Sequence, residues 1–540
     1  MANSTSTSIS TTRTATASSS AATHSLPSTS SPSKFNPETG YHDGDIAFLV
    51  ISIALVLLMV PGVGFFYSGL SRRKSALSLI FISILACAVT IIQWFIWGFS
   101  LSFSRDVVSS GFIGTLSNAF FIGVLEQPFD ENSAHKIPVL LFAVYQGLFS
   151  AIAVVLAAGA AAERGRLLPC VVFMFVWATL VYDPVACWTW NPHANGGWAY
   201  EMGVLDWAGG TPVHVVGGCA SLAYSMVLGK RKGHGTHELN YRPHNVASVV
   251  IGTVFLWVGW FGFNAGAALA PNLKAVVSVA TTNLAACVGG ITWCMLDWKL
   301  ERKWSAVGFC SGVVAGLIAI TPGSGLVPIW AAVPFGILGA GSANYGTKIK
   351  FLCNIDDALD TFAVHAVAGL VGNILTGIFG SKAIAHLDGT TNIHGGWLDH
   401  NWKQLLFQLA GSFAGGVYSF IMTALIVVVL DLIPGLSLRV SEAAEVLGID
   451  DSEIGEFAYD YVELTREVGI DGGAGSTMDG VGETGSMFSN AQLRQQQQQQ
   501  QVGRSASPMI ASAAGARAFP REDTKDSAIV FGSGQPAFYG

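Results

Sequence analysis

The sequence predicts an all-α polytopic membrane protein with eleven transmembrane helices, and three observations support this. Of the 540 residues, 51% are hydrophobic and 12% are charged, whereas about 25% of an average soluble protein is charged. From Ile46 onward, apolar runs follow one another, each near the ~20 residues that a helix needs to cross the hydrocarbon layer. The 62 glycines also fit this class, because small residues let helices approach closely in lipid.

The chain divides into four segments. Residues 1–44 are rich in Ser, Thr and Ala and lack the basic and apolar regions of a signal peptide, so we expect a disordered extracellular tail. Residues 45–432 form the membrane domain. Residues 433–470 mix charged and apolar side chains and predict a proximal cytoplasmic regulatory segment that forms a short helix and docks. Residues 471–540 are rich in Gly, Ser, Ala and Gln and predict a disordered cytoplasmic tail.

Eleven apolar runs account for the membrane domain. They cover residues 46–70, 76–103, 137–162, 167–187, 208–229, 246–270, 276–298, 306–322, 325–345, 358–380 and 404–432. The eighth and ninth runs are short, and only a Pro-Gly-Ser turn at 322–324 separates them.

The distribution of basic residues predicts the orientation. Fourteen Lys and Arg lie in the odd-numbered connecting loops and five in the even-numbered ones. Because basic loops stay in the cytoplasm, the N-terminus is expected outside and the C-terminus inside. Asn3 would then be a possible glycosylation site, and Ser505 and Ser507 possible phosphorylation sites for a kinase. The first 432 residues hold 21 basic and 20 acidic side chains, which argues against a nucleic-acid partner.

Two of the runs share a short pattern around a histidine. Val213 to Gly218 and Val364 to Gly369 both read V-H-x-V-x-G, and each lies in the fifth run of its half of the chain. This indicates an inverted five-helix repeat plus one extra helix. An acid precedes each histidine, Asp206 before His214 and Asp360 before His365.

A histidine inside a membrane helix is costly unless it meets a polar partner or lines a pathway. Two readings of His214 and His365 stay open. Each imidazole either bonds a backbone carbonyl and packs, or takes part in proton relay or in hydrogen-bonding a small amine.

Aromatic residues form a second group. Tyr145 and Phe149 are four residues apart and therefore share a helix face, Trp190 follows the fourth run, and Trp260 and Phe263 lie in the sixth. Such rings can hold a small cation by cation–π attraction. They can equally form interfacial belts or fill the core.

The sequence shows no motif for catalysis, phosphate binding or metal binding. The eight cysteines form no C-x-x-C pair, and we find no nucleophile–base motif, phosphate loop or metal-ligand cluster. We therefore expect no cofactor, no metal and no enzymatic activity.

In combination, five motifs resemble the ammonium transporter family, which comprises Amt proteins, methylammonium permeases and Rhesus proteins. The resemblance covers residues 45–465. The long Ser/Thr-rich N-terminus, the long tail and the Trp-Asn-Pro segment at 190–192 are most similar to fungal permeases. His214, where some fungal paralogues have an acid, is similar to their high-affinity branch, which also acts as a nutrient sensor. The motifs are Pro61-Gly62 with Phe65 to Leu70, Ala162-Glu163-Arg164, Asp206 to His214, Gly259 to Gly266, and Asp360 to His365.

The resemblance implies a homotrimer in the plasma membrane with one pore per protomer, and it implies a role for each candidate residue. Two positions depart from the bacterial pattern: Ala267 stands where a serine hydroxyl helps to bind the cation, and Tyr145 replaces a phenylalanine. The implied roles are an external recruitment site of Trp190, Phe149, Tyr145 and Asp206, a gate of Phe149 and Phe263, the paired pore histidines His214 and His365, and the supporting residues Trp260 and Asp360.

The implied function is transport of ammonium or methylammonium across the lipid bilayer. We expect ammonium to lose its proton at the pore mouth and to pass as ammonia, while the proton follows through the histidines. Two alternatives stay open: an ammonium sensor that signals through its C-terminal tail, and a neutral ammonia gas channel. Asp206 has an alternative of its own, since an acid before a helix also caps it.

Overall fold

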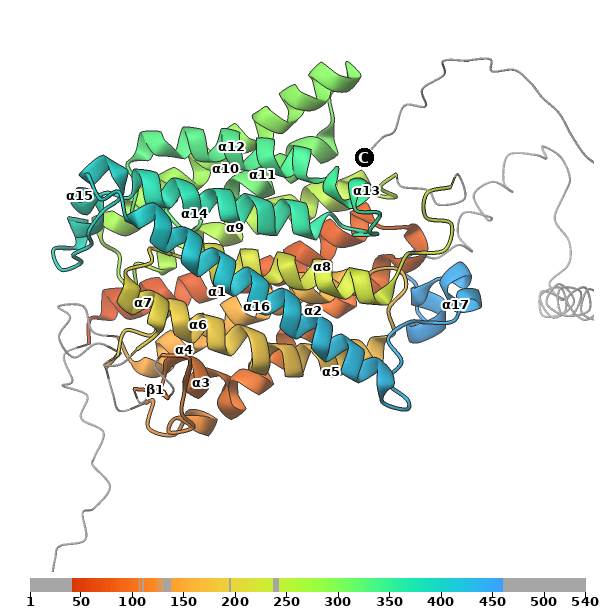
Figure 1. Cartoon of the computed structure of the whole chain (residues 1–540), viewed down its shortest axis with the longest axis horizontal. Helices are drawn as coiled ribbons and strands as arrows, with labels where there is room; N and C mark the ends of the chain where they lie inside the picture. Colours follow the sequence, from red (N-terminus) through yellow and green to blue (C-terminus); the bar gives the residue numbers. More distant parts are fainter. Residues whose placement is uncertain are drawn as a thin grey trace, which may run out of the picture.

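The computed structural model describes residues 41–105, 107–108, 111–125, 128–129, 137–193, 196–236 and 242–459. Residues 1–40 and 460–540 lie outside the described residues; they include most of the predicted tail at 1–44, with Asn3, and the whole predicted tail at 471–540, with Ser505 and Ser507. Asp43 and Gly44, at the end of the predicted N-terminal tail, belong to the first helix instead. Helices run side by side along the long axis of the molecule (Figure 1). One small antiparallel sheet pairs β1 (Val107–Val108) with β2 (Ile113–Gly114).

The helices up to the first histidine-bearing span form the first half of the membrane domain. They are α1 (Asp43–Leu70), α2 (Ala76–Gln93), α3 (Phe99–Phe103), α4 (Val139–Ala158), α5 (Leu167–Trp177), α6 (Asp183–Trp190), α7 (Trp198–Met202) and α8 (Val216–Leu228). π-helical turns join α2 to α3 at Trp94–Gly98, join α5 to α6 at Ala178–Tyr182, and begin the α8 span at Gly210–Val215.

The remaining helices form the second half and the proximal tail. They are α9 (Val246–Gly266), α10 (Leu273–Glu301), α11 (Ala306–Ile320), α12 (Ala332–Gly346), α13 (Ile349–Leu352), α14 (Ala368–Phe379), α15 (Lys382–Ala385), α16 (Gln404–Leu432) and α17 (Glu442–Leu447). A π-helical turn at Phe362–Val367 begins the α14 span, as Gly210–Val215 begins that of α8.

Each of the eleven predicted runs coincides with a helical segment, so the predicted fold class is confirmed. Within the described residues, nine segments are long and apolar enough to cross a membrane. The other two are α11 and α12, with 15 residues each. These are the eighth and ninth runs, which only a short turn separates, and the count of eleven crossings stays a prediction.

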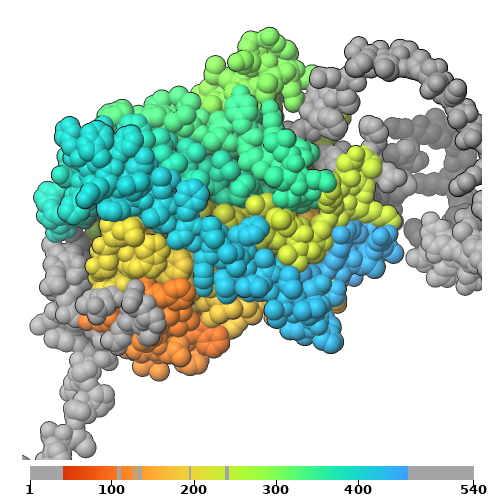
Figure 2. Space-filling model, in the orientation of Figure 1, coloured from red at the N-terminus to blue at the C-terminus, as the bar shows by residue number. Residues whose placement is uncertain are grey.

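The two ends of the bundle differ in character. α7, α15 and the small sheet lie at one end, and α17 lies at the other (Figure 1). Lys232 and Arg231 follow α8 at the α17 end, where the backbone N–H of Lys232 donates to Glu445 at 2.6 Å. Figure 2 shows the α17 segment in blue against this end of the molecule. The basic loop after α8 and the proximal tail therefore share one end of the bundle, and the orientation of this end across the membrane stays a prediction.

The proximal tail uses carboxylates to bind helix starts. Asp450 accepts hydrogen bonds from the backbone N–H groups of Leu77 and Ser78 at the start of α2, at 2.9 and 2.8 Å. Glu453 accepts one from Leu167 N at the start of α5, at 2.9 Å. The first N–H groups of a helix lack partners within the helix and favour negative charge. The expected short helix and its docking are present in the described part, 433–459.

A buried ion network closes the same end of the bundle. The Arg231 guanidinium binds Glu163 at 2.9 Å and Asp356 at 2.7 Å, and Arg72 binds Glu163 at 2.6 Å. Burial by itself raises the pKa of Glu163, but the charges of Arg231 and Arg72 outweigh it and hold this pKa below its ordinary value. Burial also opposes ionisation of Asp356, and its hydrogen bonds and charge contact with Arg231 lower its pKa strongly.

Candidate functional site

The two predicted histidines meet in the buried interior. Their Nδ1 atoms lie 3.3 Å apart, although 151 positions separate them in the chain. One Nδ1 therefore carries a hydrogen and donates it to the other. Both side chains are buried, and each lies on a π-helical turn, an irregularity often found at functional sites.

Glycines four residues after each histidine allow this close approach. A Cβ atom on Gly218 would lie 2.5 Å from the backbone nitrogen of Ala366, and one on Gly369 would lie 3.1 Å from Cβ of His214. Any larger residue at Gly218 must push the two spans apart. The glycine in the repeated V-H-x-V-x-G pattern is therefore explained by the contact between its two copies.

An aspartate caps each histidine-bearing span from eight residues before the histidine. Asp206 Oδ1 accepts from the N–H groups of Gly209 and Gly210, both at 2.8 Å, and Oδ2 accepts from Thr211 N at 2.7 Å. Asp357 Oδ2 accepts from Phe362 N at 2.9 Å. The capping reading of Asp206 is thus confirmed.

Asp360 is not the structural counterpart of Asp206 that the sequence predicted. It lies five residues before His365 with φ of 56°, as Gly209 lies five before His214 with φ of 109°. Its carboxylate binds Lys350 Nζ at 2.7 Å. The counterpart of Asp206 is therefore Asp357, which the equal eight-residue spacing could have revealed.

Aromatic rings cluster beside the histidine pair, where Phe263 contacts the His214 ring with a centroid distance of 6.2 Å. Phe149 and Phe263 stack with their centroids 3.9 Å apart and their planes 12° from parallel. Trp190 meets Phe149 edge-on at 6.0 Å. Tyr145 packs on Phe149 at 4.9 Å, and its hydroxyl donates to the carbonyl oxygen of Phe263 at 2.7 Å. α4, α6 and α9 thus bring together the four aromatic residues implied for recruitment and gating.

Tyr145 is one of the two departures from the bacterial pattern, and its hydroxyl holds the backbone of Phe263 in place through their hydrogen bond. Ala267, the other departure, lies partly buried against the core and offers no hydroxyl. The indole Nε1 of Trp190 donates to the backbone oxygen of Asp206 at 2.9 Å. Asp206 thus reaches Trp190 through its carbonyl, while its carboxylate is used in capping.

A small cavity lies beside the histidines. Its volume is about 20 Å³, and a cavity of about 10–15 Å³ is enough to hold one water molecule. Besides the two imidazoles, its walls are almost wholly apolar. The other lining residues are Met59, Val63, Phe66, Tyr67, Ile152, Leu156, Leu256, Trp260 and Val314.

The His214 ring is held on one side by Trp260. The two rings stack at 5.4 Å, and the Trp260 indole donates to Thr321 Oγ1 at 2.8 Å. Within the described part of the chain, the buried Nε2 of His214 has no hydrogen-bond partner. A small polar molecule in the cavity would therefore find a hydrogen-bonding nitrogen there.

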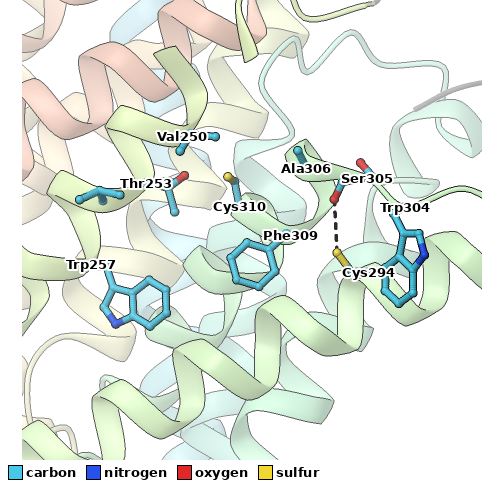
Figure 3. A pocket seen from close by; sticks show the side chains of 10 residues that line it. Val250, Thr253, Trp257, Cys294, Trp304, Ser305, Ala306, Phe309 and Cys310 are labelled. Carbon is cyan, nitrogen blue, oxygen red and sulfur yellow. Dashed lines mark hydrogen bonds between the residues drawn. The ribbon is translucent and has the colours of Figure 1, made fainter. Parts of the chain in front are cut away.

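A second pocket lies apart from these residues. It has a volume of about 470 Å³ between α9, α10 and α11, and its lining includes Trp257, Cys294 and Phe309 (Figure 3). The Cys294 thiol donates to Ser305 O at 3.3 Å. Among the described residues, no cluster of His, Cys, Asp or Glu could hold a metal ion.

Comparisons with known proteins show the family to which this sequence is similar. A model of the Ammonium Transporter Family matches residues 47–459. Ammonium transporter 1 of Schizosaccharomyces pombe is 53% identical over 428 residues, which are 79% of this chain and 84% of that protein. Ammonium transporter MEP3 of Saccharomyces cerevisiae is 47% identical over 79% of this chain and 86% of its own.

Solved structures show the same fold. The crystal structure of Saccharomyces cerevisiae Mep2 matches with a TM-score of 0.71 and 45% identity, covering 75% of this chain and 92% of that chain. The crystal structure of Candida albicans Mep2 matches equally well, with a TM-score of 0.71 and 45% identity, over 78% of this chain and 91% of that one.

Proposed function

The chain belongs to the ammonium transporter family, and on that premise we propose that it conducts ammonia and a proton separately through the cavity beside His214 and His365. The observation that carries this proposal is the cavity itself. It has room for about one small molecule and is lined by two hydrogen-bonded imidazoles, and the stacked Phe149 and Phe263 rings lie next to His214 through Phe263. The proposed substrates are ammonium, which the names of the relatives give, and methylammonium, which the sequence resemblance implies.

Recruitment begins at the aromatic cluster outside the gate. Trp190, Phe149 and Tyr145 present ring faces to a small cation, which cation–π attraction stabilises by roughly 0.5–2 kcal/mol. Ala267 adds no hydroxyl ligand. Binding therefore depends more on Trp190, whose indole is fixed by its hydrogen bond to the Asp206 carbonyl.

Selection follows from the apolar cavity behind the gate. Ammonium and potassium have similar size and charge, so size alone does not separate them. An unpaired charge is costly in an apolar cavity. Ammonium can lose a proton and enter as neutral ammonia once Phe149 and Phe263 separate, whereas potassium keeps its charge and is excluded.

The proton takes the route through the imidazoles. The Nδ1 atoms are hydrogen-bonded to each other, and His214, whose Nε2 has no hydrogen-bond partner among the described residues, lines the cavity. A proton accepted at one ring can thus be passed on at the other, so transport carries net charge. A neutral gas channel would need the same cavity but no relay.

Current measurements on proteoliposomes test this function. We expect a current after an ammonium concentration jump and none after a potassium jump. We also expect the current to be lost in His365→Ala. Full ammonium current and potassium exclusion in His365→Ala would refute the relay. Ammonia flux without current in the unchanged protein would instead support the gas channel.

A sensor function has one observation in its favour, the docking of the proximal tail onto the starts of α2 and α5. We propose that residues 433–470 are regulatory and that the tail beyond them serves kinases or signalling partners. Deletion after residue 470 should then abolish signalling and preserve transport. Loss of both would indicate that the distal tail gates the pore.

The assembly and orientation complete the proposal. We propose a homotrimer in the plasma membrane, with the N-terminus outside and the C-terminus in the cytoplasm. The placement of α17 beside the basic loops supports this orientation. Accessibility of the two termini to protease in intact cells tests it.

A further inference from the structure

Helix α16, which lies beyond the inverted repeat, has two unlike faces. One face carries large apolar side chains that are more than half exposed. The other carries Gln404, Gln408, Ser412 and Ser419, all buried. The first three are four residues apart and therefore follow one stripe. Polar side chains in a membrane helix are costly unless bonded. The exposed residues are Leu406, Phe413, Val417, Ile421 and Leu425.

The two glutamines bind the backbone of the loop after α7. Gln408 Oε1 accepts from Leu205 N at 2.7 Å, and its Nε2 donates to Leu205 O at 2.6 Å. Gln404 Nε2 donates to Gly203 O at 2.8 Å and to Gln408 Oε1 at 3.1 Å. Gln408 thus satisfies both backbone groups of a single loop residue.

That loop residue adjoins the recruitment site. Leu205 immediately precedes Asp206, whose carbonyl accepts the indole N–H of Trp190. The far side of Asp206 is also tied to α16. Its Oδ2 holds Thr211 N, and Asn373 Nδ2 donates to both Thr211 Oγ1, at 2.9 Å, and Ser412 Oγ, at 2.8 Å. The polar stripe therefore brackets the segment that holds Trp190.

Close contact between α16 and this segment depends on a glycine. A Cβ atom on Gly415 would lie 2.7 Å from Cγ2 of Thr211. Because α16 lies this close, a glutamine side chain on it can reach the loop backbone directly. Gln408 is not among the residues that line the cavity beside the histidines. Its effect on ammonium binding therefore passes through Leu205 and Asp206.

We propose that Gln408 is a positioning residue for ammonium recruitment: by fixing both backbone groups of Leu205, it sets the place of the Asp206 carbonyl and hence of the Trp190 ring. This inference rests on the proposed recruitment of ammonium at Trp190. Loss of the two hydrogen bonds frees the loop, so the ring spends less time in the geometry that binds the cation.

The test compares transport kinetics of Gln408→Met with those of the unchanged protein in proteoliposomes. Methionine matches the length of glutamine without its hydrogen bonds. We expect KM for methylammonium to rise about tenfold and the maximal rate to stay within about twofold, the pattern of lost binding alone. Ser419→Ala is the matched control. It removes a buried hydrogen bond on the same face, to Val216 O at 2.7 Å, and should leave KM unchanged.

A double-variant cycle separates positioning from general damage. If Gln408 acts through Trp190, Gln408→Met should raise KM no further in a Trp190→Leu background. Independent, multiplying effects overturn the inference, as does an unchanged KM in Gln408→Met alone. An unchanged KM in Trp190→Leu refutes the recruitment site itself, and with it the inference that rests on it.

Gln408→Asn keeps the test decisive if Gln408→Met does not accumulate. Asparagine keeps the amide on a side chain one methylene shorter, which does not reach both backbone groups of Leu205, so we expect an intermediate rise in KM of about threefold, as for one lost hydrogen bond rather than two. No rise in this variant, with protein present in the membrane at the normal level, overturns the proposal.

Discussion

Replacing Gly218 by alanine should separate the two histidines without removing either imidazole. The added Cβ would lie 2.5 Å from Ala366 N, whereas ordinary contacts begin at 3.4 Å. The spans must therefore move apart by about 0.9 Å at this point. The same shift applied to the 3.3 Å between the Nδ1 atoms brings them to about 4.2 Å, beyond hydrogen-bonding distance.

The expected result is a loss of most ammonium current with both histidines still present. Overpacking of this kind costs about 1–3 kcal/mol of folding free energy, so the protein should still accumulate and melt at a lower temperature. The assay is current after an ammonium jump in proteoliposomes, beside the melting temperature in detergent.

Gly217→Ala is the matched control. Its Cβ would lie 3.1 Å from Cβ of Leu156 on α4, not between the two histidine-bearing spans. We expect it to keep most of the current. A Gly218→Ala protein that melts at a lower temperature but conducts at the normal rate would refute the requirement for contact between the histidines.

The remaining predictions concern hydrogen bonds and charge. Tyr145→Phe leaves the buried carbonyl of Phe263 without its hydroxyl donor and should lower folding stability by about 1–3 kcal/mol, measured as a fall in melting temperature; an unchanged value would show that the bond contributes nothing. Asp450→Ala removes the cap on α2 and should cost about 1 kcal/mol, and proteolysis should then cut the proximal tail faster, which equal cutting rates would contradict. Glu163 and Asp356 have lowered pKa values in the folded state, so the unfolded chain binds more protons in acid. Their contribution should be complete above the ordinary carboxyl values of 3.8 and 4.5 and be lost as the pH falls below them; a melting temperature that stays constant from pH 7 to pH 3 would refute this.

Much of the candidate site was accessible from single residues and their spacing. The repeated V-H-x-V-x-G pattern pointed to His214 and His365, and the structure brings the two together. Tyr145 and Phe149 share a face, as their four-residue spacing predicts. Trp190, Phe149 and Phe263 were assigned through the resemblance to a family, because aromatic residues also fill cores and interfacial belts throughout this chain.

Other residues of the site were not predicted, because their signal in the sequence was weak or was not used. Asp357 precedes His365 by the same eight residues that separate Asp206 from His214, yet the nearer Asp360 was paired with Asp206 instead. Gln408 is one of several buried polar residues along α16, and nothing near it in the chain names its partner. That partner, Leu205, lies 203 positions earlier.

The sequence by itself determined the helices and their order, because the cost of placing each side chain in lipid is local and adds along the chain. It also determined which loops are basic. Only the tertiary structure decided which residues meet: the hydrogen-bonded imidazoles of His214 and His365, the stacked rings of Phe149 and Phe263, and Gln408 on α16 with the backbone of Leu205. These contacts join residues 114 to 203 positions apart, and no local periodicity encodes such distances.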